Sequence, residues 1–236
     1  MGDNQSVFDV TARSLSRLGE VMERERPDVV LVQGDTTTVM TGALAAYYLR
    51  IPIGHVEAGL RTGDKYNPFP EEINRVFADL VADLLFAPTE GAKHNLLVQG
   101  VDPDSIFVTG NTAIDALLDV AERLSGMDGA DGMLEGIPES LRDRLENGAS
   151  PQRMVLVTGH RRESFGEDLE NICVALGEIA RRNPDVELEY PVHQNPNLHN
   201  PVHKILGDSR RVHLLEPLGY APFVWLMKRS YLVLTD

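Results

Sequence analysis

The sequence predicts an α/β protein built from two Rossmann-like domains, each with a parallel sheet and helices on both faces. Short β-branched runs alternate with longer helical stretches along most of the 236 residues, and this alternation is typical of parallel sheets. One glycine-punctuated, acidic segment interrupts it at residues 126–152, as a domain boundary does. Polar residues gather where the strands are expected to end, and open α/β sheets bind ligands there.

The first half of the chain supplies four strand–helix repeats. Residues 3–25 carry apolar side chains at helical spacing, and the run Val29-Val30-Leu31-Val32 after Pro27 indicates a buried strand. A proline directly before a helix, as at Pro70, is close to the position where helices favour it. The elements that follow are, in order, a small-residue helix at 39–49, a strand at 51–56, a helix at 71–83, a strand at 84–87, a helix from Thr89, a strand at 106–108 and a helix at 113–124.

The second half begins with the boundary segment, in which a short helix is expected at 139–146. The alternation then resumes with a β-branched run after Arg153. In order, we expect a strand at 154–157, a helix at 169–181, a strand at 186–190, a helix at 201–206, a strand at 212–215, a helix at 221–228 and a strand at 231–234. The domains are therefore placed at 1–125 and 153–236, with a linker at 126–152.

Composition limits the classes of protein to consider. The formal net charge is −14, from 36 acidic and 22 basic residues, which argues against a nucleic-acid binder because such proteins need a basic surface. No apolar run reaches the roughly 18 residues of a membrane span. The single cysteine, Cys173, forms no internal disulfide and suits a reducing compartment. We therefore expect a cytoplasmic protein that meets neither membrane nor nucleic acid.

Three carboxylates follow expected strand ends or open a helix in the first domain. Asp35 lies in Gly34-Asp35-Thr36-Thr37-Thr38, Glu57 follows a strand, and Glu71 opens a helix. If they converge on one cleft, such a cluster suits general acid–base work because neighbouring carboxylates raise one another's pKa. Capping explains Thr36 equally well, and the helix dipole is a sufficient reason for Glu72 and a possible one for Glu71.

The second domain opens with a basic loop, Gly159-His160-Arg161-Arg162. Arginines at a strand end can bind a diphosphate through bidentate contacts. A surface loop with local Arg–Glu pairs is an equally good explanation of the same residues. No Walker motif, no G-x-G-x-x-G and no zinc-like spacing occurs, so neither a P-loop NTPase, a standard dinucleotide oxidoreductase nor a zinc site is expected.

At these residues the sequence resembles the non-hydrolysing UDP-N-acetylglucosamine 2-epimerases. The matching runs occur in the order of the family and in both halves of the chain. They lie at residues 30–38, 55–64, 70–75, 109–112, 158–166, 191–193 with 195–197, and 222–223. Jointly they are highly specific, although each alone is not.

The resemblance implies a glycosyltransferase-B-like fold and an isomerase that interconverts UDP-N-acetylglucosamine and UDP-N-acetylmannosamine for surface polysaccharide or other glycan precursors. It implies elimination of UDP to a 2-acetamidoglucal and re-addition with inverted C2, with no cofactor and no metal. By position, the catalytic residues are Asp35, Glu57, Glu71 and His160, the last near the diphosphate. The substrate-binding residues are Arg61, Arg161, His193 and Phe223, the last in a loop that holds the uracil. The second domain is then the nucleotide-binding one.

The ends of the chain depart from the family pattern. Family members begin with a strand that ends in Gly-Thr-Arg-Pro-Glu, and they continue past Leu-Thr-Asp with Ser-Gly-Gly; this chain has neither. We therefore expect an incomplete first domain, an incomplete end of the second, and an unstable or inactive isolated chain, because parallel sheets are buried on both faces. The full-length protein is expected to be a homodimer. The alternatives are a hydrolysing or diacetamido-sugar 2-epimerase of the same fold, and an inactive nucleotide-sugar-binding remnant.

Overall fold

The computed structural model describes residues 6–125, 132–146, 153–159 and 166–235. The chain divides into two compact units, Met1–Thr112 and Ala113–Asp236. Each unit contains one four-stranded parallel sheet, so the predicted α/β class with two parallel sheets is confirmed. None of the described helices has the length and apolar character needed to cross a membrane.

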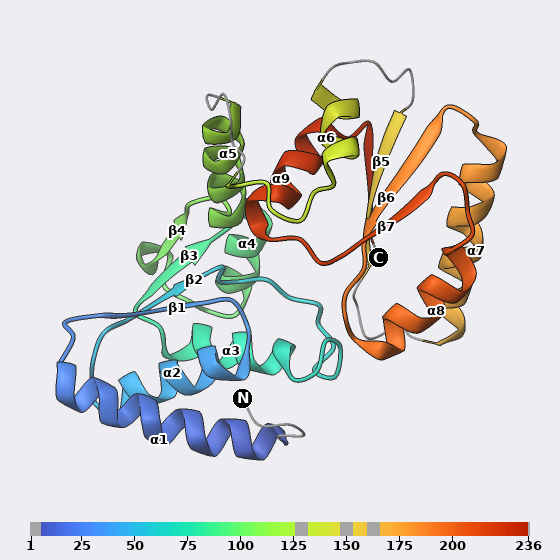
Figure 1. The fold of residues 1–236 in the computed structure, drawn as a ribbon. Coiled ribbons are helices and arrows are strands. Elements are labelled where there is room, and N and C mark those ends of the chain that lie inside the picture. Colours follow the sequence, from blue (N-terminus) through green and yellow to red (C-terminus); the bar gives the residue numbers. More distant parts are fainter. Residues whose placement is uncertain (1–5, 126–131, 147–152, 160–165, 236) are drawn as a thin grey trace. The chain divides into compact units, whose positions relative to one another are not determined.

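The first unit has its strands in sequence order, β1-β2-β3-β4 (Figure 1). The strands are β1 (Val30–Gln33), β2 (Ile53–Val56), β3 (Leu84–Ala87) and β4 (Ile106–Val108). The helices are α1 (Val7–Glu25), α2 (Thr37–Tyr48), α3 (Glu71–Val81), α4 (Glu90–Val98) and the 3-10 turn η1 (Pro103–Ser105). Because all four strands are parallel and adjacent in sequence, their carboxyl ends lie along one edge of the sheet.

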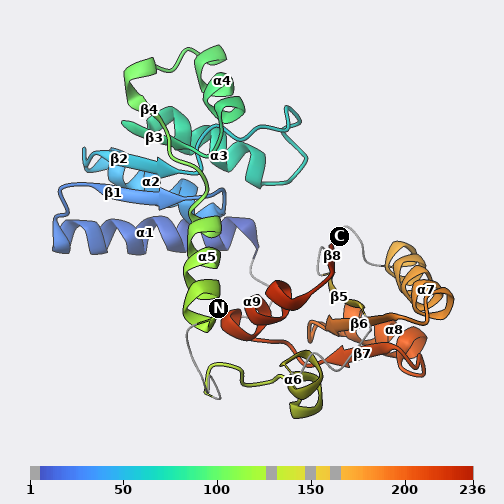
Figure 2. The same ribbon diagram turned by 90° about the horizontal axis from the view of Figure 1, so that it is seen from above.

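Local signals set the helix starts in this unit. Ser6 and Asp9 form a reciprocal capping box at α1, and the Thr36 hydroxyl accepts from the Val39 N–H at the start of α2. Alanines of α2, including Ala43 and Ala46, are fully buried. Their small side chains let α1 and α2 pack closely, and Figures 1 and 2 show these helices side by side.

The described helices of this unit cover one face of its sheet. Val32, His55 and Leu85 stand in register on that face and are buried. On the opposite face, Leu31 is 64% exposed and Phe107 is 44% exposed. The sequence predicted helices on both faces, and within the described part of this unit that prediction is wrong. The alternation of strands and helices does not say on which face each crossover packs.

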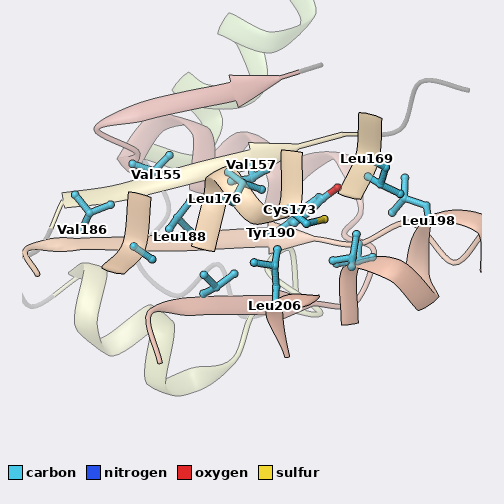
Figure 3. Close-up of a cluster of buried hydrophobic side chains, with 14 residues drawn as sticks. Val155, Val157, Leu169, Cys173, Leu176, Val186, Leu188, Tyr190, Leu198 and Leu206 are labelled. Carbon is cyan, nitrogen blue, oxygen red and sulfur yellow. The ribbon is translucent and has the colours of Figure 1, made fainter. Parts of the chain in front are cut away.

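The second unit has the strand order β7-β6-β5-β8. Its strands are β5 (Arg153–Thr158), β6 (Val186–Pro191), β7 (Val212–Leu215) and β8 (Leu232–Thr235), and its helices are α5 (Thr112–Ser125), α6 (Glu139–Glu146), α7 (Glu167–Arg182), α8 (Pro196–Leu206) and α9 (Tyr220–Arg229). α7 and α8 pack on one face through a cluster that contains Cys173, Leu188 and Tyr190 (Figure 3). Leu156, Trp225 and Leu226 belong to a second cluster that includes side chains of α5, α6 and α9.

The units divide after Thr112, the first residue of α5, whereas the sequence predicts a domain boundary after this helix. Leu124 of α5 is buried in the second cluster, and the Lys228 ammonium donates to the Ala121 carbonyl at 3.3 Å. Leu134 and Leu141, from the segment expected to be a linker, are buried in the same cluster. Their apolar side chains find partners far along the chain, which local composition does not reveal.

Helix α8 begins earlier than the sequence indicated. It was expected from Pro201, but it starts at Pro196, and Pro201 lies inside it. The Asn195 side chain accepts from the Asn197 N–H at 3.0 Å, and Pro196 occupies the first helical position, where no N–H is needed.

Candidate active site

The carboxyl ends of β1 and β2 bring two of the predicted catalytic carboxylates close together. Gln33 pairs with Val56 in the register, and the Gly34 N–H donates to the Val56 carbonyl at 3.1 Å. A β-carbon built on Gly34 would lie 3.8 Å from Oε2 of Glu57. Asp35, the next residue, therefore begins its loop beside the Glu57 carboxylate.

Glu57 occupies a strained turn. Its φ is +74°, a left-handed conformation that costs a residue with a β-carbon about 1 kcal/mol. The backbone N–H groups of Glu57 and Ala58 both donate to the Phe86 carbonyl, at 3.0 and 3.1 Å, and hold the turn. The Glu57 carboxylate makes no hydrogen bond or ion pair with the part of the chain that the structure describes. Backbone strain of this kind is concentrated at functional sites.

Asp35 is held by the first turns of α3. The Arg75 guanidinium forms a close ion pair with Oδ2 of Asp35, and the Asn74 amide donates to the Asp35 carbonyl at 2.9 Å. The side chain of Asp35 remains 33% exposed. Its carboxylate is thus charge-paired on one side and open on the other, which suits orienting a ligand.

Glu71 and Glu72 have opposite environments, although they are neighbours. Glu72 is buried, and its Oε1 accepts from the N–H groups of Thr62 and Gly63, each at 3.1 Å. Glu71 opens α3 and has no hydrogen-bond or ion-pair partner among the described residues. It lies four residues before Arg75 on the same helix face, and Arg75 contacts Asp35. Asp35 and Glu57 therefore follow neighbouring strand ends, and Glu71 opens the helix whose Arg75 pairs with Asp35.

Arg61 has a structural environment. Its Nη2 donates to Oδ2 of Asp79 at 2.7 Å and to Oε1 of Gln99 at 2.7 Å, and its Nη1 donates to the Leu60 carbonyl at 2.7 Å. Only 10% of its side chain is exposed. These contacts fix the loop after β2, and a substrate contact by Arg61 stays a prediction.

Sequence reasoning missed the supporting role of one face of α3. Glu72, Arg75 and Asp79 recur at positions i, i+3 and i+7, which lie on the same side of a helix. Glu72 and Asp79 are buried, and Arg75 is 11% exposed. Charged residues at helical spacing between apolar ones would have been the available signal.

The predicted residues of the second unit are more scattered. His160 and Arg161 lie outside the described residues. His193 is exposed just after β6, and its Nδ1 accepts from the Asn195 N–H at 3.1 Å. Its Nε2 makes no hydrogen bond with the described residues and can donate to a ligand. Phe223 lies in the first turn of α9, not in a loop, and packs partly buried against the cluster that contains Trp225.

A second cluster of charged groups is found on the sheet of this unit. Arg144 of α6 donates to Oε1 of Glu189 at 2.5 Å, and His213 of β7 contacts Glu187 on the same strand as Glu189. Burial raises the pKa of Glu189 to about 7, against the opposing effect of His213 and Arg144. No group of three or more acidic, histidine or cysteine side chains suited to a metal occurs among the described residues.

Comparisons with known proteins agree on one family. A family model described as UDP-N-acetylglucosamine 2-epimerase matches residues 1–236. A curated protein of that name from Salmonella typhimurium (strain LT2) is 49% identical over 236 residues, which cover 100% of this chain and 61% of the relative. Its counterpart from Escherichia coli (strain K12) is 47% identical over 240 residues and also covered to 61%. The chain thus spans about three fifths of the length of these relatives.

Solved structures give the same result. The crystal structure of UDP-GlcNAc 2-epimerase from Neisseria meningitidis bound to UDP-GlcNAc matches with a TM-score of 0.86 and 40% identity, over 100% of this chain and 62% of that one. The enzyme from Methanocaldococcus jannaschii, in complex with UDP-GlcNAc and UDP, matches with a TM-score of 0.75 and 34% identity, over 99% and 61%. These relatives have a glycosyltransferase-B-like fold, which confirms the fold predicted from the sequence.

Proposed function

The chain belongs to the UDP-N-acetylglucosamine 2-epimerase family, and on that premise we propose that the full-length protein interconverts UDP-N-acetylglucosamine and UDP-N-acetylmannosamine. The observation that supports this proposal is that Asp35 and Glu57 follow the carboxyl ends of two neighbouring parallel strands, where such sheets bind ligands, and that Arg75 of the helix opened by Glu71 pairs with Asp35. The presence of UDP-GlcNAc in the solved relatives supports the choice of substrate.

In the proposed reaction, a carboxylate removes the proton from C2 of the sugar. The electron pair forms the C1–C2 double bond of a 2-acetamidoglucal, and the bond from C1 to the diphosphate oxygen breaks. UDP then adds back to C1 while C2 receives a proton on the opposite face. The sugar's overall oxidation state is unchanged, so this route needs no nicotinamide.

The environments of the three carboxylates suggest a different role in the reaction for Asp35 than for the other two. Glu57 and Glu71 have no ion-pair partner among the described residues, so each is open to exchange a proton with C2. Asp35 is paired with Arg75 and partly exposed, so we assign it to orienting the sugar. Two unpaired carboxylates can serve the two faces of C2, which inversion at that carbon requires.

The remaining roles concern the nucleotide. We propose that His160 and Arg161 contact the diphosphate, since Arg forms bidentate phosphate contacts. His193, through its Nε2, and Phe223 are assigned to the nucleotide, and Arg61 to the substrate in addition to its ion pair. We further propose that the second domain binds the nucleotide, that the full-length protein is a cytoplasmic homodimer, and that its product feeds surface polysaccharide or other glycan synthesis.

The test follows the fate of the C2 proton. The full-length protein that carries this sequence is incubated with UDP-N-acetylglucosamine in D2O, and the sugars are followed by proton NMR. We expect UDP-N-acetylmannosamine to form with deuterium at C2 of both epimers. Free UDP with N-acetylmannosamine would instead indicate a hydrolysing epimerase, and UDP binding without deuterium incorporation would indicate an inactive remnant.

A further inference from the structure

One buried carboxylate on α3 contacts the loop that presents Glu57 directly and the loop that presents Asp35 through His55. Asp79 is 4% exposed, and its Oδ1 lies 2.6 Å from Nδ1 of His55. Its Oδ2 accepts from the Gly59 N–H at 3.1 Å and from Arg61. A carboxylate with both oxygens occupied in this way has little freedom to move.

The contact with His55 continues to the loop of Asp35. His55 is fully buried on β2, and its Nε2 lies 2.9 Å from the Gly34 carbonyl. A carbonyl only accepts, so Nε2 carries a hydrogen and donates it. One further proton lies between Nδ1 of His55 and Oδ1 of Asp79, whichever of the two atoms holds it. Asp79 therefore fixes, through His55, the peptide group that joins Gly34 to Asp35.

The contact with Gly59 controls the turn of Glu57. Glu57 and Gly59 have φ values of +74° and +84°, and a β-carbon on Gly59 would lie 2.3 Å from the Ala92 carbonyl oxygen. The turn is thus tight against α4 at Gly59, and the Asp79 carboxylate anchors its last N–H. Asp79 therefore holds this turn together with the Phe86 carbonyl, which accepts from the N–H groups of Glu57 and Ala58.

We propose that Asp79, acting through His55 and the Gly59 N–H, is a positioning residue that sets the placement of Asp35 relative to Glu57. This proposal rests on the proposed epimerase function. Neither Asp79 nor His55 touches the substrate, but proton transfer needs its groups within hydrogen-bond reach of the reacting atom. A displacement of about 1 Å at such a site costs on the order of 100-fold in rate.

The test compares two carboxylates of the same segment. Asp83 also accepts a hydrogen bond from β2, from the Ile53 N–H at 2.8 Å, but at the amino end of the strand. In the full-length protein that carries this sequence, we expect Asp79→Asn to lower kcat by at least about 10-fold, with KM and UDP affinity within about 2-fold. Asp83→Asn, the matched control, should keep kcat within about 2-fold of the wild-type value, even if it lowers Tm as much as Asp79→Asn does.

A second pair of variants addresses His55. His55→Leu removes both contacts, whereas His55→Gln keeps an N–H that can reach the Gly34 carbonyl. We expect His55→Gln to recover part of the kcat that His55→Leu loses. Equal losses in the two variants at equal Tm would contradict a positioning role for this hydrogen bond.

Hydrogen exchange separates this proposal from the proposed function. Asp79→Asn should accelerate exchange of the Gly59 and Glu57 amides, while Asp83→Asn accelerates exchange at Ile53 instead. If the wild type is active and Asp79→Asn keeps its kcat, the positioning role is overturned. The same holds if Asp83→Asn loses as much kcat as Asp79→Asn does. A wild type without turnover counts against the epimerase function. In that case hydrogen exchange still tests the positioning role, because an unchanged exchange rate of the Gly59 amide in Asp79→Asn overturns it.

Discussion

The guanidinium of Arg75 forms an ion pair with the carboxylate of Asp35, although 40 residues separate them in the sequence. The same guanidinium lies 3.4 Å from Oε2 of Glu72. One cation therefore compensates a carboxylate at the candidate site and a buried carboxylate beneath it.

Replacing Arg75 by Gln should destabilise the first unit. It leaves Glu72 buried without its cation, and an unpaired buried charge is costly, so we expect the free energy of unfolding to fall by about 3 kcal/mol. Urea denaturation measures this change. Arg24→Gln is the control, because the Arg24–Glu25 pair is exposed and its loss should cost less than about 1 kcal/mol. Equal effects of the two substitutions would contradict the role of Arg75.

The neighbours Glu71 and Glu72 should respond oppositely to the same substitution. Glu71→Gln removes a carboxylate that has no hydrogen-bond or ion-pair partner among the described residues. We therefore expect kcat to fall by roughly 100-fold or more, with little change in Tm. Glu72→Gln weakens two hydrogen bonds to the N–H groups of Thr62 and Gly63, so its main effect should be a lower Tm. Steady-state kinetics and thermal unfolding of both variants decide the question, and a large loss of Tm in Glu71→Gln would count against it.

Alanine at Gly59 should be much more damaging than at Gly63. Both glycines have positive φ, +84° and +80°, so both substitutions place a β-carbon in a left-handed conformation, which costs about 1 kcal/mol. Only at Gly59 would the new β-carbon meet the Ala92 carbonyl oxygen, at 2.3 Å, while Gly63 has nothing within 4 Å. We expect a total loss of about 3 kcal/mol or more for Gly59→Ala. Chemical denaturation that gives similar losses for both would disprove the close packing.

The second unit should become less stable as the pH rises from about 4.5 to about 7. Burial raises the pKa of Glu189 from 4.5 to about 7 in the folded state, so the folded protein binds this proton more tightly than the unfolded chain does. The resulting stability is fully present below about pH 4.5 and is lost as the pH approaches 7, and amounts to about 3 kcal/mol.

Glu189→Gln tests this origin, because Gln cannot ionise. We expect the variant to lose most of the decrease in unfolding free energy between pH 5 and pH 8 that the wild type shows, measured by urea denaturation at each pH. Glu216→Gln, at an exposed position between β7 and α9, should keep the wild-type dependence. If the pH dependence of the unfolding free energy is unchanged in Glu189→Gln, it arises from another titrating group.

The sequence was most informative about elements whose signals are local. β3, β4, α6 and β7 have the bounds predicted for them, because short apolar or amphipathic runs end at clear turn residues. Thr36 caps α2 as expected. The start of α8 was wrong because Pro201 was taken as a helix boundary, whereas the Asn195 cap decides where the helix begins.

For the site, the sequence determined which residues are candidates and the tertiary structure decided their environments. Asp35, Glu57 and Glu71 follow from strand ends and a helix start, which are features of local sequence. Their difference in pairing depends on Arg75, Asn74 and Asp79, which reach these loops because α3 packs beside β2. A charge interaction depends on the distance and burial of both partners, and neither quantity is fixed until the chain is folded.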